Sequence, residues 1–359
     1  MTEEMAETLH IDELERFWQQ LADEFSPYIE ELATKNFLDM LKDPDQLSLQ
    51  SVIKGMLSFL LYEIIMNGKL LGTLIVLAIF ATILQTMLTA FEQSSINKIA
   101  NFVVLLVLLF ITLETFYLAI NYAKDAIESM SDFIIALFPL MLGIIASLGQ
   151  FSQVAFFHPI IILLIHFGGL LMSKFIFPLL YLSALLVIIS ELNEQFKVTH
   201  LAQLFRTIGL AVLGIYISVF LTILSIQGVA SGIQDGVALK TTKFIASNFI
   251  PVIGNTLTDA ADTILSAGLL LKNAIGIVGL IMIVLYAGFP AIKIMVLSFI
   301  FKLVAGLLQP LGPTPIIKTL NAMSKYMVYV LACLFGMTFT FFLTIVIIVA
   351  ASNIPILLR

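Results

Sequence analysis

Runs of apolar residues, each about as long as a membrane-crossing helix, fill this chain from residue 69 to residue 351. A bilayer core holds no water, so a segment that crosses it must satisfy its own backbone hydrogen bonds, and a helix does this within one segment. We therefore predict an all-α polytopic membrane helical bundle with about eight crossings. The crossings are placed at residues 70–91, 99–122, 154–172, 175–190, 204–226, 266–288, 290–308 and 328–351.

The composition excludes most other classes of protein. Hydrophobic residues make up 60% of the chain and charged residues 12%, which is more apolar than a soluble core requires. The single cysteine, Cys333, excludes an intrachain disulfide and a cysteine metal site. Basic clusters never exceed two residues, so no nucleic-acid partner is expected. The sequence motifs of hydrolases, metalloproteases and phosphate loops are absent, and we predict no enzyme, no cofactor and no metal site.

The first 66 residues differ from the rest because they carry 14 acidic and 4 basic residues. Between residues 8 and 25, apolar side chains recur at spacings of three and four, which predicts an amphipathic helix. We expect a soluble, acidic helical head with an apolar interaction stripe, available to partner helices or for docking onto the chain's own membrane domain: Leu14, Trp18, Leu21 and Phe25. A further helix at 47–66 is interrupted by Lys54 and Glu63 and is expected to lie on the membrane surface.

The lysines in short loops predict the orientation, because such lysines stay on the cytoplasmic side of a membrane. With eight crossings, an extracytoplasmic head places most loop lysines inside: Lys98, Lys174, Lys240, Lys243, Lys318 and Lys325. A head of this size needs a leader for translocation, so we expect a cleaved or deleted signal peptide ahead of residue 1. Lys293 and Lys302 lie inside apolar runs and are interpreted as snorkelling toward opposite interfaces.

Two pairs of prolines share one spacing, because Pro139 and Pro251 are 112 residues apart, as are Pro178 and Pro290. This offset indicates two membrane units of three crossings each, and an odd number of crossings would make them an inverted internal repeat. Residues 133–149 and 251–259 would then be corresponding elements, either re-entrant or interfacial. The predicted parts are an acidic head at 1–66, a two-helix hairpin at 67–123, unit A at 124–226 and unit B at 227–359.

A polar segment at residues 227–263 interrupts the apolar chain. Gly228, Gly232 and Gly236 recur at every fourth position, which favours a helical packing strip, and a flexible loop that uses glycine for positive φ explains them equally. The residues after this strip fit either an unwound turn that binds a small cation or a capped surface helix. Together with an acid inside the second crossing, they form a candidate pathway or ion site: Glu114, Pro139, Pro251, Asn255, Thr258 and Asp259.

Two stretches of the polar segment, 227–244 and 249–260, resemble the signature of the stage III sporulation protein AE family. The similarity extends over nearly the whole chain, including Gly312-Pro-Thr-Pro. The resemblance implies a multi-pass protein in the mother-cell membrane around the forespore of endospore-forming bacteria. It also implies a place in the envelope complex that joins mother cell and forespore after engulfment and supports late forespore-specific transcription. Family members usually begin with a cleavable signal peptide, whereas this chain starts at the acidic head.

These observations lead to two hypotheses about function. The first is a non-enzymatic membrane core of a transenvelope channel or secretion-like complex required for endospore formation. Its partners would be the lipid bilayer, the other membrane proteins of the complex and further copies of itself. The alternative is a permease-like transporter of a small solute or ion, built on the inverted repeats, with its site at the broken elements near Pro139 and Pro251.

Overall fold

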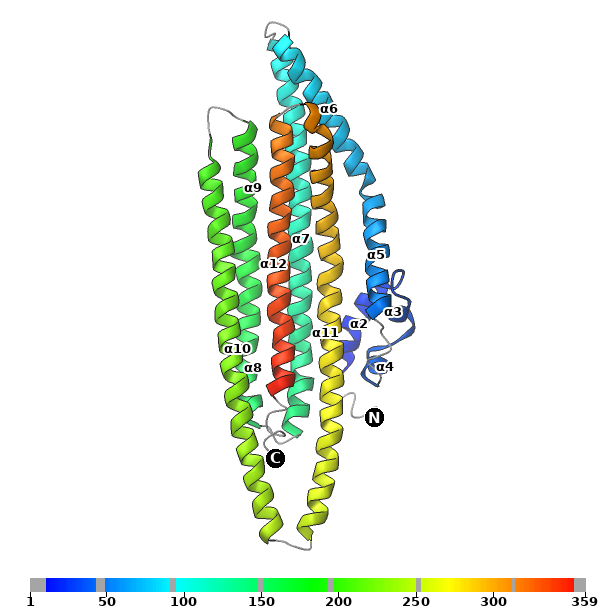
Figure 1. Cartoon of the computed structure of the whole chain (residues 1–359), viewed down its shortest axis with the longest axis vertical. Helices are drawn as coiled ribbons and strands as arrows, with labels where there is room; N and C mark the ends of the chain where they lie inside the picture. The colour runs from blue at the N-terminus through cyan, green and yellow to red at the C-terminus, as the bar shows by residue number, and fades with distance from the viewer. Residues whose placement is uncertain are drawn as a thin grey trace.

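The computed structural model describes residues 11–42, 49–90, 95–147, 151–192, 197–249, 253–311 and 314–351. Within these ranges the regular structure is helical, as the sequence predicts, and long helices form a tall bundle with a small head against one side (Figure 1). The head contains α2 (Ile11–Phe25), α3 (Glu30–Thr34) and α4 (Phe37–Lys42). The remaining elements are α5 (Leu49–Met66), α6 (Gly68–Ala90), α7 (Ser95–Ser147), α8 (Phe151–Leu171), a π-helical turn (Met172–Ile176), α9 (Phe177–Leu192), α10 (Thr199–Phe249), α11 (Ile253–Leu308), a 3-10 turn (Gln309–Leu311) and α12 (Pro315–Ala351).

Within the described residues, five stretches of helix are long and apolar enough to cross a membrane. Helices α5 and α6, bent by 42° where they meet, add a sixth if they form one crossing. The expectation of about eight crossings is therefore not confirmed. The five stretches are Phe102–Ala146, Pro159–Glu191, Thr199–Ile226, Leu270–Leu308 and Pro315–Ala350.

The count differs because helices continue where the sequence predicts turns. Residues 123–132 belong to α7, so residues 133–147 extend that helix and do not form the expected re-entrant element. Pro139 lies inside α7 and Pro290 lies inside α11. A proline removes one backbone donor, and a long helix tolerates this because neighbouring groups satisfy the freed carbonyl.

The expected break between the crossings at 154–172 and 175–190 is also replaced by continuous helix. The π-helical turn Met172–Ile176 follows α8 directly and leads into α9, which begins at Phe177. A π-helical turn accommodates an extra residue without ending the helix, so α8 and α9 together form one candidate crossing.

The inverted internal repeat is not confirmed either. Helix α7 runs through residue 123 and α10 runs through residue 226, the positions where the sequence places boundaries between parts. Residues 227–249 of the polar segment are the last turns of α10, and residues 253–263 are the first turns of α11. Glycines spaced by four residues are compatible with a continuing helix, because that spacing keeps them on one helical face.

The centre of the bundle lies where α7, α11 and α12 pack on one another. Gly279 of α11 marks a close approach, because a Cβ at this position would contact Leu137 of α7 and Ile345 of α12. Both of those side chains are buried. Helices α9 and α10 pack against α12, while α5 and α6 pack against α11.

Large apolar side chains remain exposed along the outer faces of the long helices. Examples are Phe102 and Phe110 on α7, Leu163 and Phe167 on α8, and Ile215 on α10. Extended apolar surface is unfavourable in water, but lipid chains accommodate it without cost to the backbone hydrogen bonds. The exposed faces are therefore those of a multi-pass membrane protein.

Candidate functional site

Helix α2 places its apolar stripe inside the head. The spacing of three and four residues puts Leu14, Trp18, Leu21 and Phe25 on one helical face, and all four are at most 4% exposed. The indole nitrogen of Trp18 donates a hydrogen bond to the carbonyl oxygen of Lys35 at 2.6 Å. This bond ties α2 to the short connection between α3 and α4.

An aromatic cluster joins the head to the bundle. The ring of Phe25 stacks on Phe289 of α11, with centroids 3.6 Å apart and planes inclined by 4°. Phe59 of α5 meets both rings edge-on, at 5.9 Å from Phe25 and 5.0 Å from Phe289. All three rings are buried, so the cluster removes a large apolar area from solvent and holds the end of α2 against two other helices.

Polar contacts fix the orientation of the head on the bundle. The hydroxyl of Tyr286 donates to the carbonyl oxygen of Phe17 at 2.9 Å, and Phe17 meets Phe133 of α7 edge-on. The ammonium group of Lys293 lies 3.0 Å from Glu24 Oε1. It also lies 5.2 Å from the centroid of the Tyr122 ring, so Lys293 contacts the head and α7 at once. Directional contacts of this kind permit one docked orientation.

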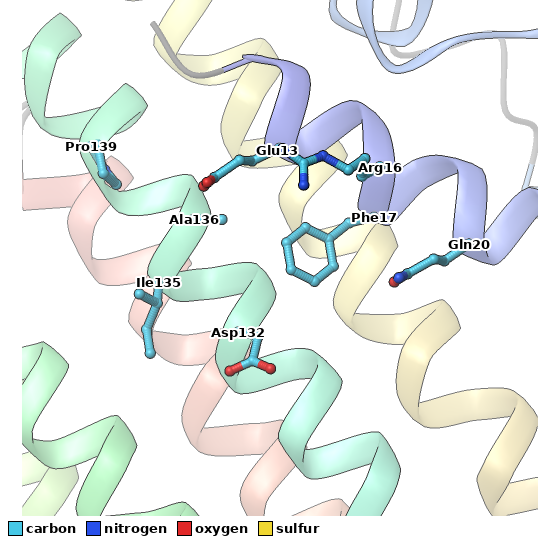
Figure 2. A pocket seen from close by; sticks show the side chains of 8 residues that line it. All are labelled: Glu13, Arg16, Phe17, Gln20, Asp132, Ile135, Ala136 and Pro139. Carbon is cyan, nitrogen blue, oxygen red and sulfur yellow. The ribbon is translucent and has the colours of Figure 1, made fainter.

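A cleft of about 470 Å³ lies between α2 and α7. Figure 2 shows the ring of Phe17 projecting from α2 into this space, with the carboxylates of Glu13 and Asp132 entering it from opposite helices. The other lining residues are Arg16, Gln20, Ile135, Ala136 and Pro139. A lining with two carboxylates and one guanidinium group suits ionic contacts.

Burial changes the acidity of one carboxyl group in the head. Glu15 Oε2 accepts a hydrogen bond from the backbone nitrogen of Phe37 at 3.0 Å. Desolvation raises the pKa of Glu15 above its ordinary value, and the nearby charge of Asp39 adds to the rise, while the bond from Phe37 opposes it. Ionisation of Glu15 therefore works against the packing of α2 on α4.

Two of the candidate pathway residues, Glu114 and Pro139, lie far apart on one helix. Glu114 is exposed on α7, and Pro139 lies 25 residues later in the same helix, about 37 Å along its axis. Asn255, Thr258 and Asp259 lie in the first turns of α11, and Pro251 lies outside the described residues. Of these residues, Pro139 lines the cleft beside the head.

The candidate packing strip lies within one helix, since Gly228, Gly232 and Gly236 all belong to α10.

The sequence reasoning missed the residues of the bundle that receive the head. Lys293 was interpreted as snorkelling, yet it pairs with Glu24, 269 residues away in the chain. Tyr286 and Phe289 belong to an apolar run in which nothing distinguishes them from lipid-facing residues. Lys272 was also missed: it is buried in α11 and donates to the carbonyl oxygen of Val349 at 3.2 Å.

Comparison with known proteins gives the family of the chain. The model of the family described as stage III sporulation protein AE matches residues 32–352. The stage III sporulation protein AE of Bacillus subtilis (strain 168) is 42% identical over 359 residues, which cover all of this chain and 90% of that relative. No solved structure matches. A match over most of the chain, together with this identity, shows that the protein belongs to the stage III sporulation protein AE family.

Proposed function

We propose that this protein is the non-enzymatic membrane core of a transenvelope channel or secretion-like complex required for endospore formation. It would act in the mother-cell membrane around the forespore, with its head outside the cytoplasm. Membership of the sporulation family supports a role in endospore formation, and the docked head supports the role of a scaffold. The observation that carries the scaffold role is the stacking of Phe25 on Phe289, which holds the head in one position on the bundle.

The docked head determines which surface is available to partners. Its apolar stripe is buried against the chain itself, so partner helices do not need to supply that contact. Most of the charged residues exposed on the described part of the head are acidic, including Asp12, Glu13, Asp23 and Glu30. We infer that the other proteins of the complex meet the head through basic or polar surfaces, because opposite charges favour encounter and fix the register of an interface.

The packing at the centre of the bundle favours a scaffold over a permease. A transporter needs polar groups and broken helices at mid-membrane. Here Leu137, Gly279 and Ile345 bring α7, α11 and α12 into direct apolar contact. Glu114, the acid expected in a pathway, is exposed on α7 instead of lying in this core.

The distribution of basic residues along the bundle supports the proposed orientation. Helices α9 and α11 end, and α10 and α12 begin, at one end of the bundle, whereas α10 ends and α11 begins at the other (Figure 1). With six crossings, the first of these ends would be cytoplasmic, because it is rich in basic residues, and the head and the 227–263 segment would lie outside. The basic residues at that end are Lys197, Arg206, Lys302, Lys318 and Lys325.

Complementation in Bacillus subtilis that lacks its own family member tests this function, with heat-resistant spores and a late forespore reporter as readouts. We expect the double variant Glu114→Gln and Asp259→Asn to sporulate normally, because a scaffold needs neither carboxylate. Loss of spores in this variant, at normal protein level in the membrane, would favour the transporter.

The same complementation assay tests the candidate packing strip. Gly232→Leu is expected to abolish sporulation, and full activity of that variant would exclude the packing strip.

A further inference from the structure

A second polar cavity, of about 440 Å³, lies between four helices at the end of the bundle where α10 and α12 begin. Its charged lining consists of Glu191 from α9, Arg206 from α10, Lys302 from α11, and Lys318 and Lys325 from α12. None of these residues belongs to the interface between head and bundle, and their use as markers of orientation does not explain why they gather around one cavity.

The charges in this lining do not balance. Four basic groups and one carboxylate give a formal charge of +3. Among the described residues, no carboxylate lies within ion-pair distance of any of the four basic groups. Like charges held close together in a partly enclosed space repel one another more strongly than they do in water. The lining is therefore suited to hold an anion.

Neutral groups orient two of the cations without neutralising them. Nη1 of Arg206 donates to the hydroxyl oxygen of Tyr329 at 3.0 Å, and the guanidinium carbon lies 5.1 Å from the centroid of that ring. Nζ of Lys302 donates to Oδ1 of Asn321 at 2.9 Å. Each cation keeps further N–H groups available, since guanidinium has five donors and ammonium has three.

The remaining two cations come from one face of α12, because Lys318 and Lys325 are seven residues apart. Guanidinium binds phosphate through two parallel hydrogen bonds, and ammonium groups add compact positive charge beside it. We propose that this cavity binds a phosphate-bearing anion, either the headgroup of an anionic phospholipid or a soluble phosphate compound. Both sources share the chemistry that the lining recognises.

The surroundings of the cavity accommodate a lipid source. Phe299, one turn before Lys302 on the same face of α11, and Val328, one turn after Lys325 on the same face of α12, are exposed. Acyl chains can lie on these side chains while the headgroup enters the lining, as in basic pockets between membrane helices that bind anionic lipids. A soluble phosphate compound would use the basic and polar groups alone.

Two measurements on the purified full-length protein distinguish the sources. In the first, native mass spectrometry counts phosphatidylglycerol and phosphatidylcholine retained from mixed micelles. In the second, the thermal midpoint is followed as sodium phosphate replaces sodium chloride at constant ionic strength. The test variant is Lys318→Gln with Lys325→Gln. The matched control is Lys54→Gln with Lys69→Gln, which removes the same charge from exposed positions outside the cavity.

We expect the wild type and the control to retain phosphatidylglycerol in preference to phosphatidylcholine, and the test variant to bind it roughly 30-fold more weakly. This result identifies a lipid site. A rise of the thermal midpoint with phosphate that the test variant alone loses identifies a site for a soluble phosphate compound. No response in either measurement, or equal responses in the test and control variants, overturns the proposal. Unchanged elution and thermal midpoint in chloride verify that both variants are folded.

Discussion

The ring of Phe25 in the head lies face to face with Phe289 of α11, with centroids 3.6 Å apart and planes inclined by 4°. This contact joins residues that are far apart in the sequence and, with Phe59, closes the apolar cluster between the head and the bundle. The stability of the docked head should therefore respond to residues of the membrane domain. Trp18 is the one tryptophan of the chain and is buried in the head, so its fluorescence reports on the head alone.

Phe289→Ala should detach the head more easily, because truncation of a buried phenylalanine costs about 3–5 kcal/mol. The denaturant midpoint of the Trp18 transition is expected to fall. Phe299→Ala provides the matched control on the same helix, since Phe299 is 52% exposed and contributes little packing. An equal fall in both variants would show that the stacked contact does not hold the head.

The pair of Glu24 and Lys293 should contribute modestly, with a coupling of about 0.5–1 kcal/mol in a double-mutant cycle, because the Glu24 side chain is 57% exposed. Lys293→Met should cost more than Glu24→Gln, since Lys293 also lies over the rings of Tyr122 and Phe59. The denaturant midpoint of the Trp18 fluorescence transition is measured for both variants at low and at high salt. A coupling that salt leaves unchanged would argue against an ionic contact.

Two adjacent glycines should differ sharply on substitution. A Cβ at Gly168 would collide with the hydroxyl of Tyr216 and contact Met337, whereas Gly169 has nothing within 4 Å. Gly168→Ala should cost about 1–3 kcal/mol, because Tyr216 must move and lose its hydrogen bond to the carbonyl oxygen of Leu164. Gly169→Ala should be neutral or stabilising by up to about 1 kcal/mol through helix propensity. Thermal unfolding in detergent tests the pair, and equal effects would contradict the close packing of α8 and α10.

Glu15 should make the head less stable as pH rises. Its pKa is raised in the folded state, so its contribution favours folding below the ordinary value of about 4.5 and is lost as pH increases through the raised pKa. Glu15→Gln keeps an acceptor for the backbone nitrogen of Phe37 and should be at least as stable as the wild type at neutral pH. The difference should disappear on acidification, as the Trp18 transition measured across pH will show. A variant that is less stable at every pH would contradict this account.

The local sequence pattern was enough to predict that the helices exist. Apolar residues at spacings of three and four predict a helix at 8–25, and α2 occupies Ile11–Phe25. The same spacing places Leu14, Trp18, Leu21 and Phe25 on one face, but it does not predict what packs against that face. Local pattern did not predict where helices end, because a proline or a polar stretch ends a helix only when no neighbouring helix stabilises its continuation. The breaks expected at residues 173–174 and at residue 289, between neighbouring crossings, were replaced by helix for this reason.

Composition and short-range periodicity are enough to predict that this protein is helical, that its surface is apolar enough for a bilayer and that its head is acidic, because these are local properties of the chain. Which groups meet depends on how the helices pack. Helix packing brings Glu24 to Lys293 across 269 residues, places Tyr216 against Gly168 but nothing against Gly169, and brings basic residues of α10, α11 and α12 to one cavity. These outcomes depend on the packing of helices distant in the chain, and such packing is set by the shape and charge of the neighbours.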